Sequence, residues 1–446
     1  MEYRDLIVTP LLIMAVLIVA YFIRPRVSDE NTRKFFFPAL MIKMFGAIAL
    51  GFIYQFYYSG GDTFTYHTHG SRPLWEAFMN SPTEGVRMFF SQGQYGAGLG
   101  SIADKVWFWR DPSSFFVVQI STIFDLFTFS SYSATAILFS VMAFTGAWML
   151  YYVFYKTNPK AYRILAFCCL FIPSITFWGS GILKDTVTLA FVGVSTFCIY
   201  QVVFQNRIKL LYFVLLAVSF FVIFSIKKYI LISLIAAAVV WITSGFFFKI
   251  KSIMLRIVLV PAVTLFCLSL TYLIIQKVME DDAKYAIDRL AQTSMITAYD
   301  IRYGWGARQG DGSGYSLGNL DGTWQSMITL APGAINVALF RPYFWEVRNP
   351  LMAISAFESL LTLLFTVFVL ARVRLSIVPY LKAEVIFCLV FALIFAFGVG
   401  VSTYNFGTLS RYKIPLLPFY WSALAIIYYS WKRDILEGHT FKRASN

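Results

Sequence analysis

The sequence predicts an all-α polytopic membrane protein with about eleven transmembrane helices, and three observations support this prediction. Of the 446 residues, 59% are apolar and 19% are aromatic. Charged residues make up only 13%, about half of the ~25% usual in soluble domains. The mean hydropathy is +0.67. A soluble protein of this length could not cover its surface with so few charges, so a soluble enzyme, a disordered chain and a collagen-like chain are excluded.

Apolar runs recur along the chain, and each is long enough for a helix that crosses a hydrocarbon core of about 30 Å. The first run lacks a small-residue cleavage site, which predicts a retained helix and not a cleaved signal. We expect a single integral membrane domain over residues 1–446. Its predicted spans are 6–23, 34–57, 131–155, 163–179, 186–205, 210–226, 229–248, 253–275, 349–371, 382–402 and 415–431.

The positive charge is concentrated in short connections that fall on one side of the predicted membrane. The net charge is +14, and about half of the 37 Lys and Arg residues lie in these connections and the C-terminal tail. This bias predicts a multi-pass membrane protein with the N-terminus outside and the C-terminus in the cytoplasm. No nucleic-acid partner is expected, because no DNA-binding motif or basic domain accompanies the charge.

Two long loops then face outward, at about 58–114 and 276–348. The apolar stretch 115–129 follows the first loop and is predicted to be an interfacial or re-entrant helix, because Asp125 disfavours a full span. Both loops are rich in Trp, Tyr, Phe and Gly, so short helices are expected in them in place of disorder.

The first candidate site begins at the outer end of the second predicted helix, where Gly60 and Gly61 allow a sharp turn before Asp62. A carboxylate at the membrane–water boundary can act as a base or as a metal ligand. Tyr66, His67 and His69 follow and are candidates to contact a sugar or an acceptor. In a short helix, Tyr66 and His69 would share the face of Asp62. The alternative is that Asp62 caps this helix while the aromatic residues form an interface belt.

The second candidate lies between two predicted spans, where Trp178 and a Gly-Ser-Gly sequence precede Lys184 and Asp185. A lysine at the start of a helix can bind a phosphate group, and Trp178 is a candidate to contact a sugar. The alternative is a turn in which Lys184 and Asp185 only mark the membrane boundary.

The third candidate precedes the last span, where Arg411 and Lys413 place positive charge on the side that disfavours it. An anionic head group or a diphosphate would supply the missing partner. Snorkelling to phospholipid phosphates explains the same residues equally well.

The fourth candidate is an aromatic cluster at the end of the second outer loop that contains Arg341, Trp345 and Glu346. Aromatic faces beside charged groups suit sugar rings, and Arg341 could bind phosphate. The same composition is also typical of a membrane interface, which is the commoner explanation.

The chain has no Walker A sequence, dinucleotide fingerprint, HExxH or serine-hydrolase elbow. An outward-facing enzyme without a soluble nucleotide needs a substrate that is already activated, such as a sugar on a polyprenyl phosphate. The Gly-Gly-Asp62-Thr-x-x-Tyr66 sequence resembles the acidic motif in the first outer loop of GT-C-like membrane glycosyltransferases. The sequences around Lys184 and Arg411 look like those of other bacterial members of this broad group, or of O-antigen polymerases.

This resemblance implies a glycosyltransferase that moves a sugar or glycan from a polyprenyl-phosphate-linked donor to a glycan, lipid or protein acceptor. Asp62 would be the catalytic base or a metal-site residue, and Lys184, Arg341 or Arg411 would bind the phosphate. The acidic loop follows the second helix here, whereas the family places it after the first. Many members carry a second carboxylate beside the first, and here only Asp104 and Asp111 follow, later in the loop. No cofactor is certain, and a divalent metal stays open.

Three other functions stay open as alternatives to a glycosyltransferase. A polysaccharide polymerase or ligase would depend on arginines more than on Asp62. A lipid-linked glycan flippase or transporter would need a polar path inside the membrane, for which Glu358 and Glu384 are the candidates. A non-catalytic subunit of an envelope assembly is the third. All four interpretations involve membrane lipid as a partner.

Overall fold

The computed structural model describes residues 2–91, 99–247, 253–278, 289–305 and 313–444. Helices make up 84% of the structure, and the described residues contain no strand. By contacts the chain forms two compact units. Unit 1 comprises Met1–Val153 and Cys169–Lys228, and unit 2 comprises Phe154–Cys168 and Tyr229–Asn446.

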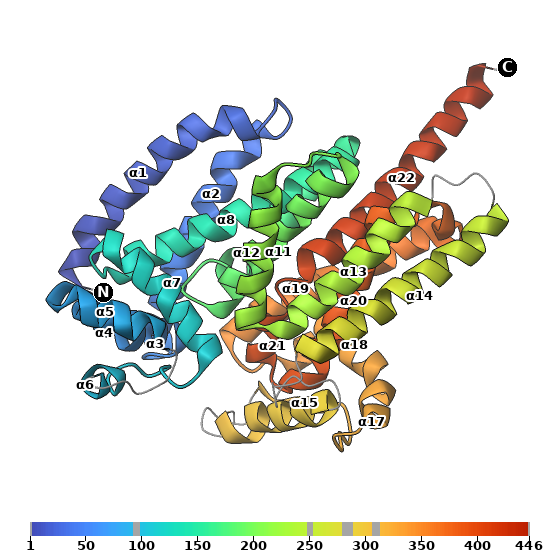
Figure 1. The fold of residues 1–446 in the computed structure, drawn as a ribbon. Coiled ribbons are helices and arrows are strands. Elements are labelled where there is room, and N and C mark those ends of the chain that lie inside the picture. The colour runs from blue at the N-terminus through green and yellow to red at the C-terminus, as the bar shows by residue number, and fades with distance from the viewer. Residues whose placement is uncertain (1, 92–98, 248–252, 279–288, 306–312, 445–446) are drawn as a thin grey trace. The chain divides into compact units, whose positions relative to one another are not determined.

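Unit 1 begins with a hairpin of two long apolar helices, α1 and α2, shown in blue in Figure 1. Short helices then lead to α7 and α8, and a second apolar pair, α11 and α12, completes the unit. The bounds are α1 Tyr3–Val27, α2 Arg33–Phe52, η1 Ile53–Tyr57, α3 Asp62–Tyr66, η2 His67–Ser71, α4 Arg72–Asn80, α5 Pro82–Phe90, α6 Gly100–Ala103, α7 Pro112–Thr128, α8 Tyr132–Thr157, α10 Pro173–Phe177, α11 Lys184–Ile199, η5 Tyr200–Phe204 and α12 Leu210–Ile226.

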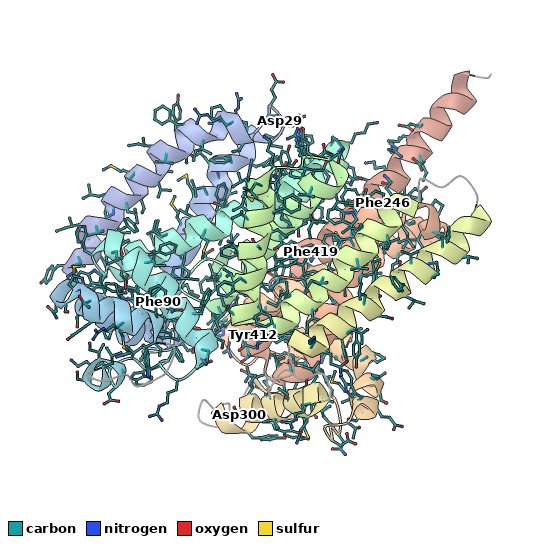
Figure 2. The ribbon with its side chains drawn as sticks, in the orientation of Figure 1. Asp29, Phe90, Phe246, Asp300, Tyr412 and Phe419 are labelled. Atoms are coloured by element: carbon teal, nitrogen blue, oxygen red, sulfur yellow. The ribbon has the colours of Figure 1, made fainter. Side chains whose placement is uncertain are left out.

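Unit 2 packs α18, α19, α20 and α22 around a core of aromatic side chains. Phe419, labelled in Figure 2, is fully buried with its ring 4.4 Å from Phe391 and 5.5 Å from Phe387. The bounds are η3 Pro159–Ala161, α9 Tyr162–Ala166, η4 Phe167–Phe171 (which reaches into unit 1), α13 Lys228–Phe247, α14 Ile253–Val278, α15 Leu290–Tyr299, η7 Asp300–Trp305, α17 Trp324–Thr329, α18 Ala331–Phe340, η9 Phe344–Glu346, α19 Pro350–Val373, η10 Arg374–Tyr380, α20 Ala383–Thr403, α21 Phe406–Tyr412 and α22 Leu417–Ala444.

Seven of the helices in the described residues are long and apolar enough to cross a membrane. They match seven of the eleven predicted spans, so a membrane-spanning protein is supported while the count of eleven is not confirmed. These helices are Tyr3–Val27, Arg33–Tyr57, Tyr132–Thr157, Lys184–Phe204, Lys228–Phe246, Pro350–Val373 and Ala383–Thr403.

The other four predicted spans differ for identifiable reasons. The run 163–179 is interrupted at Ile172, whose backbone is extended immediately before Pro173, and residues on both sides form only short helical pieces. The run 210–226 is a helix of 17 residues, at the lower limit for a span. The run 253–275 lies within α14 and most of 415–431 lies within α22, and neither helix is among the seven over its described residues.

Close backbone packing holds α2 against the broken segment of unit 1. A Cβ atom at Gly46 would lie 1.9 Å from the carbonyl oxygen of Thr176. The buried Lys43 Nζ donates hydrogen bonds to the carbonyl oxygens of Ile175 at 2.6 Å and Gly179 at 2.8 Å. Because a short helix ends there, these carbonyls have no helical partner, and the lysine satisfies them from the neighbouring helix.

Candidate functional site

Lys184 and Asp111 form the centre of a polar cluster in unit 1, although they lie far apart in the sequence. Asp111 is the N-cap of α7, and its Oδ1 accepts hydrogen bonds from the Ser113 backbone N–H at 3.1 Å and the Ser113 hydroxyl at 2.9 Å. Lys184 is the first residue of α11. Its Nζ lies 3.4 Å from Asp111 Oδ2 and donates to Ser113 Oγ at 2.7 Å. The cluster therefore brings the beginnings of two helices together.

Both side chains of this ion pair are reachable from outside the unit. The side chain of Lys184 is 19% exposed and that of Asp111 is 49% exposed. Partial burial acts to raise the pKa of Asp111, but the Lys184 ammonium and hydrogen bonds from Ser114 and Ser113 outweigh this effect and lower the pKa to about 2. Asp111 is thus fixed as a carboxylate beside the ammonium at neutral pH.

Asp62 lies close enough to Lys184 for a direct electrostatic interaction, so the structure brings two of the sequence-predicted site residues together. The chain reaches Asp62 through Gly60 and Gly61, whose φ angles of 130° and 120° are accessible to glycine and strained for other residues. Asp62 then begins α3 and is partly exposed. The predicted turn is therefore present, and it places a carboxylate near the lysine.

Asp62 is held in place by buried contacts of the residues that follow it. The Thr63 hydroxyl forms a hydrogen bond with the Tyr132 hydroxyl at 2.8 Å, and the Phe64 ring stacks on the Tyr132 ring at 4.4 Å. Thr63 is fully buried. These contacts anchor α3 to the start of α8 while Asp62 itself faces outward.

The predicted sugar contacts after Asp62 occupy three different environments. Tyr66 is buried against the Phe108 ring, with the ring centroids 4.8 Å apart. His69 is exposed and stacks on the Trp107 ring at 5.3 Å. His67 is fully buried, and its Nε2 lies 3.4 Å from Asp125 Oδ1. In this arrangement only His69 presents an accessible ring, and His67 and Tyr66 serve packing.

Asp125 explains why His67 is buried, and sequence reasoning had not connected the two. The Asp125 carboxylate accepts hydrogen bonds from the hydroxyls of Ser71 and Thr135, both at 2.6 Å, in the interior of unit 1. An aspartate in an apolar helix needs such partners, because an isolated buried charge is costly. The sequence feature that indicated this buried contact was therefore Asp125 itself, within the otherwise apolar stretch 115–129.

Asp185 and Lys227 form a second ion pair directly behind Lys184. The Asp185 side chain is 1% exposed and the Lys227 side chain is 7% exposed. Consecutive residues of a helix point about 100° apart, so Lys184 can face Asp111 while Asp185 faces the interior. Lys184 and Asp185 begin a helix and each has an ion pair with a distant residue, while the alternative that they only mark the membrane boundary stays a prediction. The predicted sugar contact Trp178 is buried nearby in the chain at 8% exposure, with its ring 6.4 Å from the Tyr54 ring.

Unit 2 contains the arginine and aromatic candidates. Arg341 forms an ion pair with Glu346, and its guanidinium lies 5.8 Å from the Tyr343 ring centroid and 5.3 Å from that of Phe406. Trp345 is 82% exposed and stacks on Tyr343 at 4.8 Å. The sequence-predicted cluster is thus assembled, with Glu346 neutralising Arg341 and Trp345 presenting an open ring face.

The remaining basic candidates behave differently from each other. Lys413 is buried, and its Nζ donates to Ser359 Oγ at 3.0 Å and to the carbonyl oxygen of Arg341 at 3.3 Å. Burial lowers the pKa of Lys413 to about 8, while the carboxylate of Glu358 acts in the opposite direction. Arg411 is partly exposed, two residues earlier on α21. Of the two, Arg411 alone is placed to meet a ligand.

The described residues contain no group of three or more His, Cys, Asp or Glu side chains that could hold a metal ion. Glu384, a candidate for a polar path inside the membrane, is partly exposed and accepts a hydrogen bond from Asn158 Nδ2 at 3.3 Å. No family model, curated protein or solved structure matches this chain. The function is therefore argued from the site alone.

Proposed function

We propose that this protein is a membrane glycosyltransferase that transfers a sugar or glycan from a polyprenyl-phosphate-linked donor to an acceptor hydroxyl at the outer face of the cytoplasmic membrane. The observation that carries the proposal is the grouping of Asp62, Asp111 and Lys184 in unit 1. Asp62 and Asp111 lie in the predicted outer loop 58–114, and Lys184 begins a helix that is long and apolar enough to cross a membrane. A lipid-linked substrate meets the protein at this boundary, with its tail in the bilayer and its phosphate at the surface.

The chemistry assigns one task to each accessible group. Asp62 takes the proton of the acceptor hydroxyl as its oxygen attacks the anomeric carbon. The bond between that carbon and the phosphate oxygen breaks, and the phosphate leaves with the electron pair. The Lys184 ammonium, at the beginning of α11, stabilises the negative charge that the phosphate gains. Asp111 and Ser113 hold the lysine side chain in the outward direction before the donor binds.

The proposal is tested with purified protein in liposomes that contain a polyprenyl-phosphate-linked sugar and an acceptor glycan or lipid with a free hydroxyl, by measuring the release of polyprenyl phosphate that depends on the acceptor. We expect Asp62→Asn to lower the rate by about 10²-fold or more, the usual contribution of a general base. Glu84→Gln, an exposed carboxylate of α5 in the same loop, is the matched control and should retain the rate. An Asp62→Asn protein that inserts normally and still turns over at the wild-type rate would contradict the assignment.

The proposed orientation has its own test. A cysteine at Glu84 should react with a membrane-impermeant maleimide added to intact cells, whereas a cysteine at Lys432 should react only after the membrane is opened. Four of the five native cysteines are buried and Cys267 is intermediate, so the background labelling should be low. Labelling of position 432 from outside would reverse the topology and remove Asp62 from the outer face.

A polysaccharide polymerase or ligase is the second candidate, favoured by the Arg341 cluster in unit 2. An arginine among aromatic rings, with the exposed Trp345 ring beside it, suits a glycan chain and its phosphate better than a single sugar. Under this candidate, Arg341→Gln abolishes the joining of lipid-linked glycans while Asp62→Asn retains it. The glycosyltransferase proposal predicts the reverse order of severity.

A further inference from the structure

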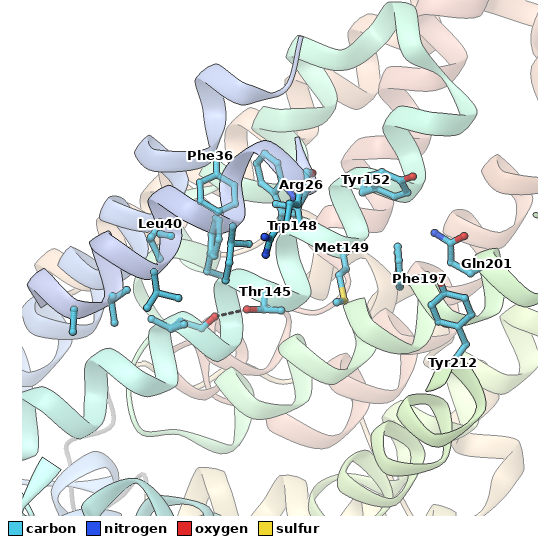
Figure 3. A pocket seen from close by; sticks show the side chains of 18 of the residues that line it. Arg26, Phe36, Leu40, Thr145, Trp148, Met149, Tyr152, Phe197, Gln201 and Tyr212 are labelled. Atoms are coloured by element: carbon cyan, nitrogen blue, oxygen red, sulfur yellow. Dashed lines mark hydrogen bonds between the residues drawn. The ribbon is translucent and has the colours of Figure 1, made fainter. Parts of the chain in front are cut away.

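A cavity in unit 1 lies between α1, α2, α8 and the C-terminal part of α11. Its volume is about 550 Å³, within the range of roughly 300–1,000 Å³ that small-molecule sites have. Figure 3 shows the side chains that line it, among them Phe36 and Leu40 from α2 and Trp148 and Met149 from α8. Most of the lining is apolar.

The cavity exists because α1 packs loosely. Only 11% of the apolar part of α1 is buried, compared with 67% for α8. The end of α1 is tied to α8 by a hydrogen bond from Trp148 Nε1 to the carbonyl oxygen of Val27 at 3.2 Å. Val19, on the wall formed by α1, is 55% exposed, so the cavity can be reached from the surroundings of the helix. In a bilayer those surroundings are lipid chains.

The lining also contains two arginines and an amide. Arg26 comes from the last turn of α1, Gln201 from η5 and Arg207 from the connection before α12. The backbone N–H of Arg207 donates to the carbonyl oxygen of Gln201 at 2.9 Å, so these two side chains start from adjacent backbone. Neither arginine forms an ion pair with a described residue, and both are exposed.

Gln201 supplies an independent sign that a ligand belongs here. Its side chain is 2% exposed, and its Oε1 atom has no hydrogen-bond partner in the described structure. A buried amide oxygen without a donor costs about 1–3 kcal/mol, so such atoms are normally satisfied. A ligand with a hydroxyl group next to an anionic group would satisfy Gln201 and neutralise the arginines together.

We propose that this cavity binds one anionic phospholipid of the surrounding bilayer, with an acyl chain between α1, α2 and α8, its phosphate at Arg26 and Arg207, and a head-group hydroxyl donating to Gln201. Basic pockets at the ends of membrane helices are suited to anionic head groups. The zwitterionic phosphatidylcholine lacks the net negative charge. Phosphatidylethanol carries the same charge as phosphatidylglycerol but has no head-group hydroxyl. The site is separate from the proposed transfer reaction.

Native mass spectrometry of the purified full-length protein tests this proposal by measuring the lipid retained from equal mixtures of matched acyl chains. We expect phosphatidylglycerol to be retained about tenfold over phosphatidylcholine, because the choline cation of phosphatidylcholine is repelled by the arginines that attract its phosphate. Arg26→Gln combined with Arg207→Gln should abolish this preference. Arg33→Gln is the matched control, because Arg33 is an exposed arginine of the same connection outside the cavity.

Two further variants keep the test decisive if the double substitution fails to fold. Ala15→Trp fills the cavity from α1 and should reduce retention of every lipid without lowering the unfolding midpoint. Gln201→Leu should erase the preference for phosphatidylglycerol over phosphatidylethanol while leaving the preference over phosphatidylcholine. Equal retention of phosphatidylglycerol and phosphatidylcholine by the wild-type protein, or unchanged retention in Ala15→Trp, would overturn the proposal.

Discussion

Replacing Lys227 by methionine removes one charge from the buried ion pair with Asp185 while keeping the length of the aliphatic side chain. Both side chains are almost completely buried, at 7% and 1% exposure. The substitution therefore leaves the Asp185 carboxylate in the interior without its ammonium partner. The surrounding residues Leu183, Ile226 and Ile230 are apolar and buried, so water cannot easily replace the lost cation.

The expected loss in the free energy of unfolding follows from the burial of both side chains. Removing one partner of a buried ion pair costs about 3–5 kcal/mol, because the remaining charge is uncompensated. Neutralising both partners, with Asp185→Asn and Lys227→Met together, leaves no buried charge and costs only the unsatisfied amide, about 1–3 kcal/mol. The double variant should therefore be more stable than Lys227→Met alone.

Lys228→Met is the matched control, because this neighbouring lysine is partly exposed and its Nζ lies 4.7 Å from the Phe224 ring centroid. Its loss should cost under about 1 kcal/mol. Denaturant unfolding in one detergent should give the stability order wild type, Lys228→Met, the double variant and Lys227→Met. A double variant no more stable than Lys227→Met would show that the two charges are not energetically coupled, and the reasoning would fail.

Three other substitutions test the packing and the electrostatics of unit 1. A Cβ at Gly146 would lie 2.1 Å from the carbonyl oxygen of Ala190, so Gly146→Leu should separate α8 from α11. We expect this variant to lose the monodisperse peak in size-exclusion chromatography. The control Gly398→Leu, where a Cβ meets nothing within 4 Å, should keep the peak. Asp125→Ala leaves the buried hydroxyls of Ser71 and Thr135 without their acceptor and should cost about 1–3 kcal/mol for each, whereas Asp125→Asn should cost less, as unfolding midpoints would show. Because the pKa of Asp111 is lowered from its ordinary 3.8 to about 2, its charge stabilises the fold above pH 3.8 and this contribution disappears as the pH falls through 2. The stability difference between wild type and Asp111→Asn should thus be constant from pH 7 to 5 and shrink below pH 4; as Asp111 is half exposed, we expect it to be under about 1 kcal/mol.

The class of fold could be predicted from the sequence because hydropathy and helix length have direct physical causes in a bilayer. The exact number of transmembrane spans could not be predicted from the sequence. Pro173 breaks a run that is mostly apolar, and an average of hydropathy over a window does not register a single residue that lacks a backbone N–H. The last predicted span is rich in Tyr and Trp, which are apolar in a core but favour an interface.

Individual site residues could be predicted from the sequence, but their arrangement in space could not. Asp62 and Lys184 were selected from their local sequences, yet their proximity depends on how α3, α7 and α11 pack. Asp111 caps the N-terminus of α7 immediately before Pro112. Nothing in the local sequence indicates that Asp111 Oδ2 faces Lys184 at the beginning of α11.

Two of the candidates that turn out to be buried, His67 and Lys413, show why accessible and internal polar residues are hard to separate by sequence. Each is a basic side chain beside an apolar segment, and the same composition suits a ligand contact or an internal partner. The deciding factor is a second polar residue in a distant helix. Asp125 plays this part for His67, and Ser359 with the carbonyl of Arg341 plays it for Lys413.

The adjacent residues Lys184 and Asp185 connect stability to the proposed chemistry. Asp185 is fixed in the interior by Lys227, and this contact determines how the first turn of α11 is rotated. Lys184, about 100° further round the helix, consequently points toward Asp111 and Asp62. If this turn could rotate freely, holding the Lys184 side chain near a phosphate would cost more conformational entropy. The buried Asp185–Lys227 pair therefore preorganises the accessible Lys184–Asp111 pair. Under the proposed function, the Asp185→Asn and Lys227→Met double variant should therefore lose transfer activity even when its folded fraction equals that of the wild type, whereas Lys228→Met should not.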